Sequence, residues 1–367
     1  MNSDALIGSV TTNELVNLLD TNPSLYLIDV REPDEVADWK IEGVHNLPLG
    51  SLADRLSEVP RDKDLVVICA KGARALQGAQ VLAEAGIASR VLEGGMGAWA
   101  STYDLVEGNF DGATVVQVRR RGKGCLSYII GAGDRAVVID PSLEVELYER
   151  VAREHGWAIT YVLDTHLHAD HISGARELVS HSGAELLLSP YDPFTYAYSP
   201  LEDGKELTLS DDVSLRVSAV SVPGHTEGST MYQLGDKAIF TGDTLFLESV
   251  GRPDLAEKAE EFAGNLYKSL HERVMPLPGA ITVFPAHYGP VVPVRAGQFV
   301  SAPLGELKEK LEALALSEAD FISWALANVK DRPPNYQEIV LVNAGAKPVG
   351  DEAIEMELGP NRCAIAS

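Results

Sequence analysis

Residues 165–171 read THLHADH and directly follow the apolar run ITYVL at residues 159–163. Four of these side chains carry groups that bind metals, namely His166, His168, Asp170 and His171. A helix would scatter these positions around its cylinder, whereas at the end of a strand that turns into a helix they can converge on one point. Converging imidazole and carboxylate groups suit zinc or ferrous iron. The stretch therefore predicts a metal site at the end of a buried strand.

Three further candidate ligands lie in short loops downstream. His225 lies in PGHTEGS at residues 223–229, Asp243 in TGDT at residues 241–244, and His287 in PAHYG at residues 285–289. Each of them follows a short apolar strand and precedes a turn. All three could therefore project from one edge of a sheet sandwich, together with the ligands of the first stretch.

This ordered set of motifs resembles the metallo-β-lactamase superfold over about residues 114–287. The resemblance implies an αββα sandwich, in which two mixed sheets pack face to face with helices outside. It also implies that the ligands divide between two metal positions. The first position takes His166, His168 and His225, the second takes Asp170, His171 and His287, and Asp243 bridges them.

Two kinds of enzyme with this fold use the ligands differently. Glyoxalase II and related hydrolases fill both positions and lower the pKa of a bridging water. Persulfide dioxygenases bind a single ferrous iron, which the resemblance assigns to His166, His225 and Asp243. The remaining candidates would then orient the ligands through hydrogen bonds: His168, Asp170, His171 and His287. Ligand identity alone leaves both enzymes open.

A second site is expected where an apolar strand at residues 64–69 ends in CAKGAR, residues 69–74. A short loop there can aim successive backbone N–H groups at one point, and the start of a helix at residues 73–85 adds positive potential. Such surroundings favour the thiolate form of Cys69, and Arg74 offers a forked donor for an oxyanion. The plainer interpretation is that Cys69 is a small apolar residue that ends a buried strand.

The neighbouring motifs favour the reactive cysteine. DVREP at residues 29–33, IEGVHNLPL at residues 41–49, the loop after Cys69 and LEGGMGAW at residues 92–99 together resemble a rhodanese domain over about residues 9–103. The resemblance implies a parallel-sheet domain in which Cys69 takes up sulfane sulfur, holds it as a persulfide and passes it on. Asp29 and Arg31 are expected to form a structural ion pair.

The loop departs from its relatives in two ways. Four residues separate Cys69 from Arg74, where cysteine-dependent phosphatases have five. Many rhodaneses carry arginine directly after the cysteine, where this chain has Ala70, so that one anion contact is lost. Lys71 is expected to compensate. The predicted sulfur-transfer residues are therefore Cys69, Arg74 and Lys71.

Together these motifs predict an α/β protein with a rhodanese-like parallel-sheet domain at residues 1–107. A metallo-β-lactamase-fold domain with a C-terminal helical extension is expected at residues 108–367. The favoured function is oxidation of a low-molecular-weight persulfide, glutathione persulfide above all, to sulfite, coupled to sulfur transfer. GDTLF at residues 242–246 and GRPD at residues 251–254 resemble the segment after the aspartate ligand of persulfide dioxygenases. In that segment Arg252 and Asp254 are expected to pair.

The expected cofactor is Fe(II), one per chain. The alternative is Zn(II), one or two per chain, in a dizinc thioester hydrolase of the glyoxalase II type with a rhodanese appendage. A third interpretation, from a different class, is a persulfide sensor or sulfur-carrier module with a structural metal. Structural sites are usually closed and rich in thiolates, which argues against the third interpretation.

Composition narrows the partners. The chain has 54 acidic and 30 basic residues and a net charge of −24, which disfavours nucleic acid and anionic membranes. Three widely spaced cysteines do not form a disulfide framework and fit a reducing compartment. With no signal-peptide pattern and no apolar run of transmembrane length, a cytoplasmic location is expected. The expected partners are a small-molecule persulfide, thiosulfate or sulfite, dioxygen, and a second copy of the chain in a homodimer.

Three remaining segments have no catalytic assignment. Residues 100–113 lose periodicity and predict a linker. The basic run RRRGKG at residues 119–124 predicts a solvated hairpin turn. Two amphipathic helices are expected at residues 304–316 and 317–329, and the tail that follows them is expected to be structural.

Overall fold

The computed structural model describes residues 3–110, 112–210, 216–254, 258–329, 332, 335–350 and 352–365. The chain divides into two compact units. Unit 1 comprises residues 1–104, 120–124 and 358–360, and unit 2 comprises residues 105–119, 125–357 and 361–367. Among the described residues, no helix is long and apolar enough to cross a lipid bilayer.

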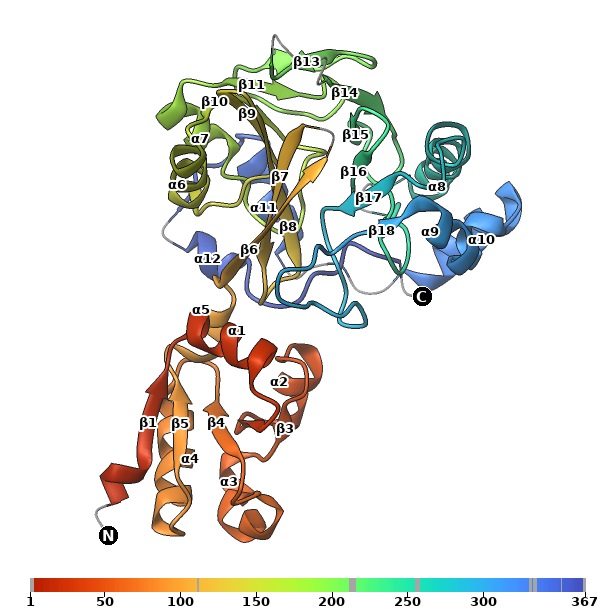
Figure 1. Ribbon diagram of the computed structural model, residues 1–367. Coiled ribbons are helices and arrows are strands. Elements are labelled where there is room, and N and C mark those ends of the chain that lie inside the picture. Colours follow the sequence, from red (N-terminus) through yellow and green to blue (C-terminus); the bar gives the residue numbers. More distant parts are fainter. Residues whose placement is uncertain are drawn as a thin grey trace. The chain divides into compact units, whose positions relative to one another are not determined.

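Unit 1 is built on a parallel sheet with helices on both faces (Figure 1). The strand order is β1-β5-β4-β2-β3, which confirms the predicted parallel-sheet domain. Its strands are β1 (Ile7–Val10), β2 (Leu25–Asp29), β3 (His45–Asn46), β4 (Asp64–Ile68) and β5 (Ser89–Leu92). Its helices are α1 (Thr12–Thr21), α2 (Pro33–Asp38), α3 (Leu49–Leu52), α4 (Ala73–Glu84) and α5 (Gly95–Trp99), with short 3₁₀ turns at Ser3–Leu6 and Ala53–Glu58.

The central strand β4 shows why unit 1 buries both faces of its sheet. Successive side chains of a strand point to opposite faces, so Leu65 and Val67 pack toward α3 and α4. Val66 and Ile68 pack toward α1 and α5 on the other face. A strand that is covered on both sides is expected to be apolar throughout, as β4 is. The predicted pair is also present, since Arg31 Nη2 lies 2.7 Å from Asp29 Oδ2 and both side chains are buried.

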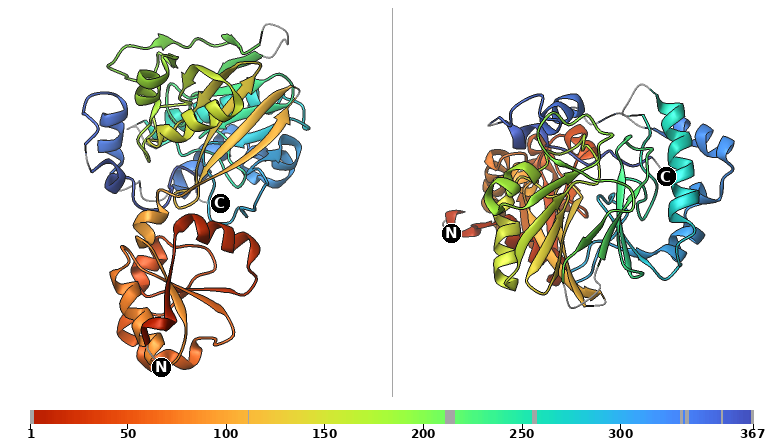
Figure 2. Two further views of the ribbon diagram at one scale, coloured as in Figure 1. Left: turned by 60° about the vertical axis from the view of Figure 1, so that its left-hand side comes forward. Right: turned by 90° about the horizontal axis from the view of Figure 1, so that it is seen from above.

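Unit 2 is a sandwich of two sheets packed face to face, with helices outside, which confirms the predicted metallo-β-lactamase fold. Figure 2 shows the two layers edge-on, with α6 and α7 outside one sheet and α8 outside the other. The order of the first sheet is β12-β11-β10-β9-β8-β7-β6, and that of the second is β13-β14-β15-β16-β17-β18. Aromatic rings fill the space between them: Tyr128 contacts Phe240 edge-on at 4.8 Å between ring centroids, and Phe240 stacks on Phe284 at 5.2 Å.

The bounds of these elements follow the chain. The first sheet contains β6 (Tyr103–Phe110), β7 (Ala113–Arg120), β8 (Cys125–Ala132), β9 (Arg135–Ile139), β10 (Ala158–Leu163), β11 (Glu185–Leu188) and β12 (Ser199–Pro200). The second contains β13 (Glu206–Thr208), β14 (Arg216–Ser221), β15 (Thr230–Leu234), β16 (Ala238–Gly242), β17 (Thr282–Pro285) and β18 (Ala302–Pro303). The helices are α6 (Val145–His155), α7 (Ala175–Ser182), α8 (Ala259–Lys268), α9 (Leu304–Lys310), α10 (Glu318–Asn328), α11 (Tyr336–Asn343) and α12 (Ala353–Met356), with a π turn at Ser269–Val274 and a 3₁₀ turn at Glu312–Ala315.

Two expectations for the junction are wrong. Most of the predicted linker at residues 100–113 forms β6, an edge strand, where polar residues are tolerated because only one side of the strand is paired. The basic run is not a solvated turn, since Arg119 and Arg120 belong to β7 and are buried. Arg119 Nη1 donates to two backbone carbonyls, at Arg295 and Gln298, and Arg120 Nε donates to the carbonyl of Ala100. Hydrogen bonds to carbonyl oxygens thus replace water around these guanidinium groups.

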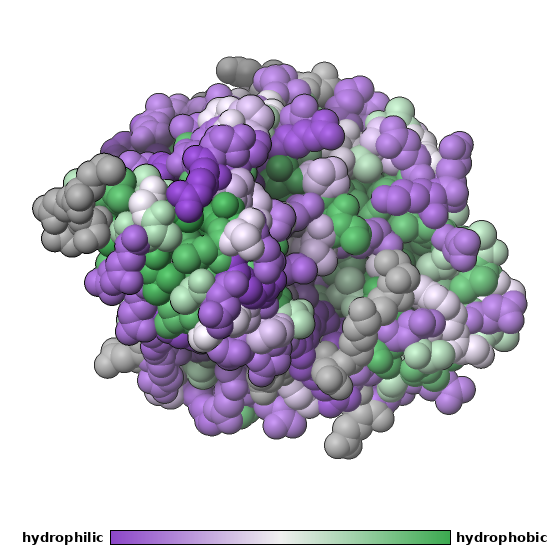
Figure 3. Space-filling view, turned by 90° about the horizontal axis from the view of Figure 1, so that it is seen from below, coloured by the Kyte–Doolittle hydropathy of each residue, from purple (hydrophilic) through white to green (hydrophobic). Residues whose placement is uncertain are grey.

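The surface reflects the charged composition of the chain. Figure 3 shows hydrophilic side chains over much of one face, with smaller apolar areas between them. One of the large exposed apolar side chains is Leu76 on α4, which is 46% exposed. Single exposed apolar residues of this kind are normal and do not by themselves indicate a binding surface.

Candidate metal centre and sulfur-transfer loop

Three of the predicted ligands converge at the carboxyl ends of strands in unit 2. His166 follows β10, His225 follows β14, and Asp243 follows β16. Asp243 Oδ2 lies 3.6 Å from His166 Nε2 and 3.4 Å from His225 Nε2, and all three side chains are buried. Among the described residues, none of these three atoms has a hydrogen-bond partner. Buried, unpartnered donor atoms around one point fit a metal ion held by two imidazoles and one carboxylate.

Hydrogen bonds on the far side of each imidazole fix its orientation. Thr165 Oγ1 lies 2.9 Å from His166 Nδ1, and the carbonyl oxygen of Arg252 lies 2.8 Å from His225 Nδ1. Each ring therefore donates through Nδ1 and keeps the lone pair of Nε2 for the centre. Burial lowers the pKa of both His166 and His225, so that both rings are neutral. Neutral imidazoles with free Nε2 atoms are the form that binds metals.

Asp243 divides its two oxygens between two tasks. Oδ1 accepts a hydrogen bond of 2.6 Å from His287 Nδ1, which leaves Oδ2 to face His166 and His225. Burial alone would raise the pKa of Asp243, but the surrounding imidazoles, His287 first, hold it below its usual value. The carboxylate is therefore ionised and fixed in direction.

Asp140, directly after β9, supports the ligand stretch and was not predicted. It is buried and has a φ of 53°, in the left-handed region. Oδ1 accepts from the backbone N–H of Thr165 at 2.6 Å, and Oδ2 accepts from Thr165 Oγ1 at 2.9 Å. Thr165 thereby becomes the acceptor for His166. The signal in the sequence is an acidic residue that ends the apolar run AVVID at residues 136–140.

Replacing Asp140 with asparagine tests this support. Asparagine tolerates the left-handed backbone, so the change removes only the charge and one acceptor. We expect metal affinity to fall by about 10–100-fold, as is typical for partners that orient ligands. Titration with a chelator, with circular dichroism as the control for folding, measures the effect. An unchanged affinity would show that Thr165 and His166 hold their orientation without Asp140.

His168 is turned away from the other three. Its Nε2 lies 3.1 Å from Asp140 Oδ1 and 3.9 Å from Asp164 Oδ1, so it forms a separate group with these two acids. Burial raises the pKa of Asp164 to about 6. The carbonyl oxygen of His168 is held by Asn343 Nδ2 at 2.9 Å. This orientation separates His168 from the cluster of His166, His225 and Asp243.

The remaining candidates form a hydrogen-bonded group beside the centre. His171 Nδ1 lies 3.0 Å from Asp170 Oδ1, and His287 Nε2 lies 3.0 Å from Asp170 Oδ2. Burial opposes charge on both rings, but the Asp170 carboxylate raises the pKa of His171 and of His287 well above the usual value. All seven predicted ligands thus lie in one buried region, in three groups that share residues.

Two cysteines near the centre escaped the sequence analysis. Cys125, the first residue of β8, has its Sγ 3.6 Å from Asp170 Oδ2. Cys363, in the tail, has its Sγ within 4.8 Å of ligand atoms of Asp243 and His287. Both thiols are free and buried. The residue type was visible in the sequence, but no local pattern placed either cysteine beside ligands so far away along the chain.

In unit 1, Cys69 lies directly after β4 and is almost fully buried. The N–H of Gly72 donates to Cys69 Sγ at 3.1 Å, and α4 begins at the next residue. Gly72 has a φ of 96°, which only glycine adopts readily. The sulfur therefore lies at the positive end of a helix, where a thiolate or a persulfide anion is stabilised.

Arg74 faces Glu35 in this structure. Its two terminal nitrogens lie 2.7 Å from the two carboxylate oxygens of Glu35, which was not predicted. The Arg74 guanidinium lowers the pKa of Glu35 to about 2. Lys71 is exposed on the loop itself. Of the three predicted sulfur-transfer residues, the loop thus brings Cys69 and Lys71 together, while the fork of Arg74 is engaged by α2.

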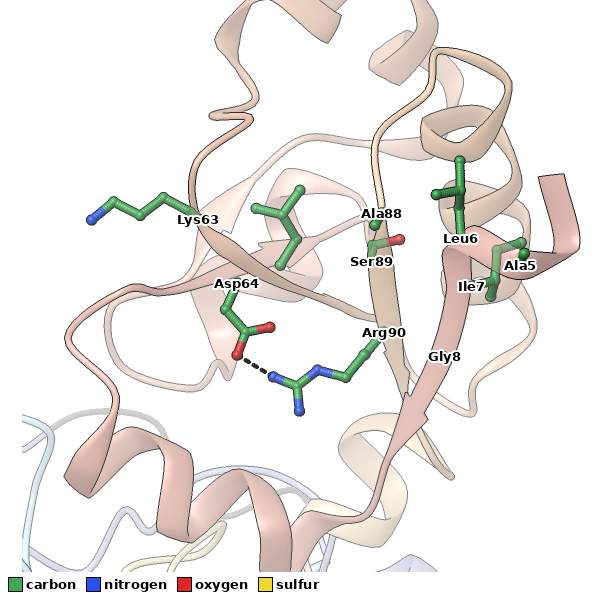
Figure 4. A pocket seen from close by; sticks show the side chains of 10 residues that line it. Ala5, Leu6, Ile7, Gly8, Lys63, Asp64, Ala88, Ser89 and Arg90 are labelled. Atoms are coloured by element: carbon green, nitrogen blue, oxygen red, sulfur yellow. Dashed lines mark hydrogen bonds and ion pairs between the residues drawn. The ribbon is translucent and has the colours of Figure 1, made fainter. Parts of the chain in front are cut away.

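A surface pocket of unit 1 lies at the opposite end of the sheet. Figure 4 shows it between the N-terminal segment and the first residues of β4 and β5, with Arg90 and Asp64 paired at 2.5 Å. Ligand sites in parallel sheets lie at the carboxyl ends of strands, where Cys69 is, and this pocket lies at the amino ends of β4 and β5. It is therefore not part of either candidate site.

Fold and site together define a metallo-β-lactamase-type metal centre on a chain that also carries a rhodanese-type loop. A family model described as Metallo-beta-lactamase superfamily matches residues 120–292, and one described as Rhodanese-like domain matches residues 11–102. The chain belongs to the metallo-β-lactamase superfamily and has an N-terminal rhodanese-like domain.

Individual relatives carry two different names. The chain is 33% identical to the human mitochondrial persulfide dioxygenase ETHE1, over 44% of this chain and 63% of that protein. It is 34% identical to hydroxyacylglutathione hydrolase of Methylococcus capsulatus, over 50% of this chain and 70% of that protein. The crystal structure of ETHE1 from Myxococcus xanthus is similar at 29% identity and a TM-score of 0.55, covering 63% of this chain and 97% of that one. The chain thus spans slightly less than two thirds of the human persulfide dioxygenase.

Proposed function

We propose that the protein oxidises a low-molecular-weight persulfide, glutathione persulfide first, to sulfite at one ferrous ion held by His166, His225 and Asp243. The observation that carries the proposal is the arrangement of these three buried, unpartnered donor atoms, from which His168 is turned away. Two histidines and one carboxylate form the ligand set of non-haem iron oxygenases, which leave positions open for other molecules. Relatives named persulfide dioxygenase support the choice of reaction.

The residues of the chain prepare the centre for this chemistry. Bound ferrous iron would supply the one-electron reactivity that dioxygen requires. Thr165 and the carbonyl of Arg252 hold the imidazole tautomers, and His287 holds Asp243 in direction. The nearly complete burial of the ligands limits water at the site. Reactive intermediates are thereby protected from hydrolysis.

Cys69 would carry out the coupled sulfur transfer. Its thiolate attacks the sulfane sulfur of a donor, the donor's S–S bond breaks, and the remaining thiol or sulfite leaves with the electron pair. The persulfide that forms on Cys69 is stabilised by the N–H of Gly72 and by α4. Sulfite is also an acceptor of such sulfur and yields thiosulfate. Joining the two activities in one chain raises the effective concentration of the shared intermediate.

The second candidate is a dizinc thioester hydrolase. The similarity to hydroxyacylglutathione hydrolases favours it, as does the presence of all seven residues that two metal positions need. The position of His168 argues against it, because the first of two zinc positions requires that ring and here it faces Asp140 and Asp164.

Reciprocal variants test the assignment of both sites. Asp243→Ala is expected to abolish metal binding and dioxygen uptake while it leaves thiosulfate sulfurtransferase activity intact. Cys69→Ser is expected to abolish sulfur transfer and to leave dioxygen uptake intact. Each variant serves as the folding control for the other. If Asp243→Ala consumed dioxygen at the parental rate, the proposed metal position would be wrong.

Metal analysis of the unsubstituted protein separates the two candidate functions. We expect about one iron per chain, together with dioxygen uptake on glutathione persulfide. Two zinc ions per chain, thioester turnover and no uptake would replace the dioxygenase with the hydrolase.

A further inference from the structure

The tail of unit 2 pairs with the loop that supports the metal centre. Gly251 and Ala364 form an antiparallel bridge. The N–H of Arg252 donates to the carbonyl of Cys363 at 2.9 Å, and the N–H of Ile365 donates to the carbonyl of Val250 at 3.0 Å. Ser249 Oγ adds a bond of 2.8 Å to the carbonyl of Ile365. Residues 361–365 therefore lie against residues 249–252 as an added strand, which we call the tail strand.

The loop beneath the tail strand already holds two of the three ligands. The carbonyl of Arg252 accepts from His225 Nδ1. Gly251 lies so close to Asp243 that a Cβ placed on it would be 1.8 Å from the carbonyl oxygen of Asp243. The tail strand is thus one layer away from His225 and Asp243, and its backbone direction is fixed by several hydrogen bonds.

Cys363 is the residue that this strand presents to the centre. Its side chain is 1% exposed, and its Sγ and ligand atoms of Asp243 and His287 all lie within 4.8 Å of one another. Asp243 contributes a buried oxygen, Oδ2, that has no hydrogen-bond partner among the described residues. A thiol beside an unpartnered carboxylate oxygen and an imidazole completes a ligand set, since thiolate sulfur binds zinc, iron and cobalt.

We propose that Cys363 is a fourth protein ligand of the metal held by His166, His225 and Asp243. The inference rests on the metal position of the proposed function. The thiol binds as a thiolate and its proton passes to water. Four protein ligands leave two positions of a six-coordinate ion for small molecules. The soft sulfur also favours iron, zinc or cobalt over magnesium or calcium.

Cys125 provides a matched control. It is also a buried thiol within the same region, but its Sγ lies beside Asp170 and it groups with His171 and His287 rather than with Asp243. Cys69 belongs to unit 1 and can be replaced by serine in every sample, so that it does not bind metal on its own.

The test uses cobalt in place of iron, because cobalt bound to thiolate absorbs strongly in the near ultraviolet. In the Cys69→Ser background, the cobalt protein is expected to show this band. Cys125→Ser should retain it, whereas Cys363→Ser should lose it and bind cobalt about 10–100-fold more weakly. Retention of the full band in Cys363→Ser, or its loss in Cys125→Ser alone, would overturn the proposal.

A measurement without any change at Cys363 guards against misfolding of that variant. X-ray absorption of the zinc-loaded Cys69→Ser, Cys125→Ser protein should show one sulfur at about 2.3 Å from the metal. A shell of nitrogen and oxygen only would exclude Cys363 as a ligand. If sulfur is bound but the iron protein takes up no dioxygen, the ligand assignment holds and the proposed dioxygenase fails. Dioxygen uptake by a protein without bound sulfur would give the opposite result.

Discussion

Gly251→Ala is expected to abolish metal binding in unit 2. The added Cβ would lie 1.8 Å from the carbonyl oxygen of Asp243 and 3.3 Å from Cβ of His225. A backbone oxygen cannot rotate away as a flexible side chain would, so the loop must move and carry both ligands with it. We expect metal content after purification to fall by about 100-fold or more, with loss of dioxygen uptake.

The control for this variant is Gly264→Ala in the middle of α8. There the new Cβ meets Ile322 Cδ1 at 3.7 Å, an ordinary contact, and alanine favours the helix. We expect full metal content and an equal or slightly higher melting temperature. If Gly251→Ala kept parental metal content with a native circular dichroism spectrum, the close contact with Asp243 would have no role in holding the ligand.

Gly95→Ala is expected to abolish sulfur transfer in unit 1 and to leave the metal centre intact. Gly95 has a φ of 58°, and a Cβ there would lie 2.2 Å from the carbonyl oxygen of Cys69. The next two N–H groups, of Met96 and Gly97, hold the carbonyls of Cys69 and Ala70 at 2.9 and 3.0 Å. These bonds keep the carbonyls out of the loop, so the alanine would misplace Cys69. A displacement of about 1 Å can cost about 100-fold in rate.

Gly97→Ala is the matched control in the same helix. Its Cβ would lie 3.6 Å from the carbonyl oxygen of Ala70, an ordinary contact, and the backbone bond to that oxygen is retained. We expect near-parental thiosulfate sulfurtransferase activity. Equal activity in both variants would mean that the contact between Gly95 and Cys69 does not set the geometry of the loop.

Local sequence patterns were sufficient for both sheet architectures and for the position of the metal ligands. Strand ends are marked by short apolar runs, so His166, Asp243 and His287 could be placed at one edge of the sandwich without further knowledge. Likewise the alternation of strands and helices up to residue 99 predicted the parallel sheet. These inferences need only the neighbours of each residue along the chain.

Contacts between distant segments could not be predicted in the same way. Arg74 is held by Glu35 from another helix, and Asp140 supports Thr165 from a neighbouring strand. Arg119 carries a charge that predicts exposure, yet it is buried because two carbonyls from residues 295 and 298 surround it. Each of these depends on a partner chosen by the fold, which no local pattern contains.

The conformation of Asp140 limits what evolution can place at that position. Glycine and asparagine accept a left-handed backbone but carry no carboxylate, and glutamate carries the carboxylate on a chain one carbon longer. Aspartate alone combines the backbone tolerance with two acceptor oxygens at the distances that Thr165 requires. Functional descendants of this chain should therefore vary less at residue 140 than at most of the core around it, although no ligand of the metal lies there.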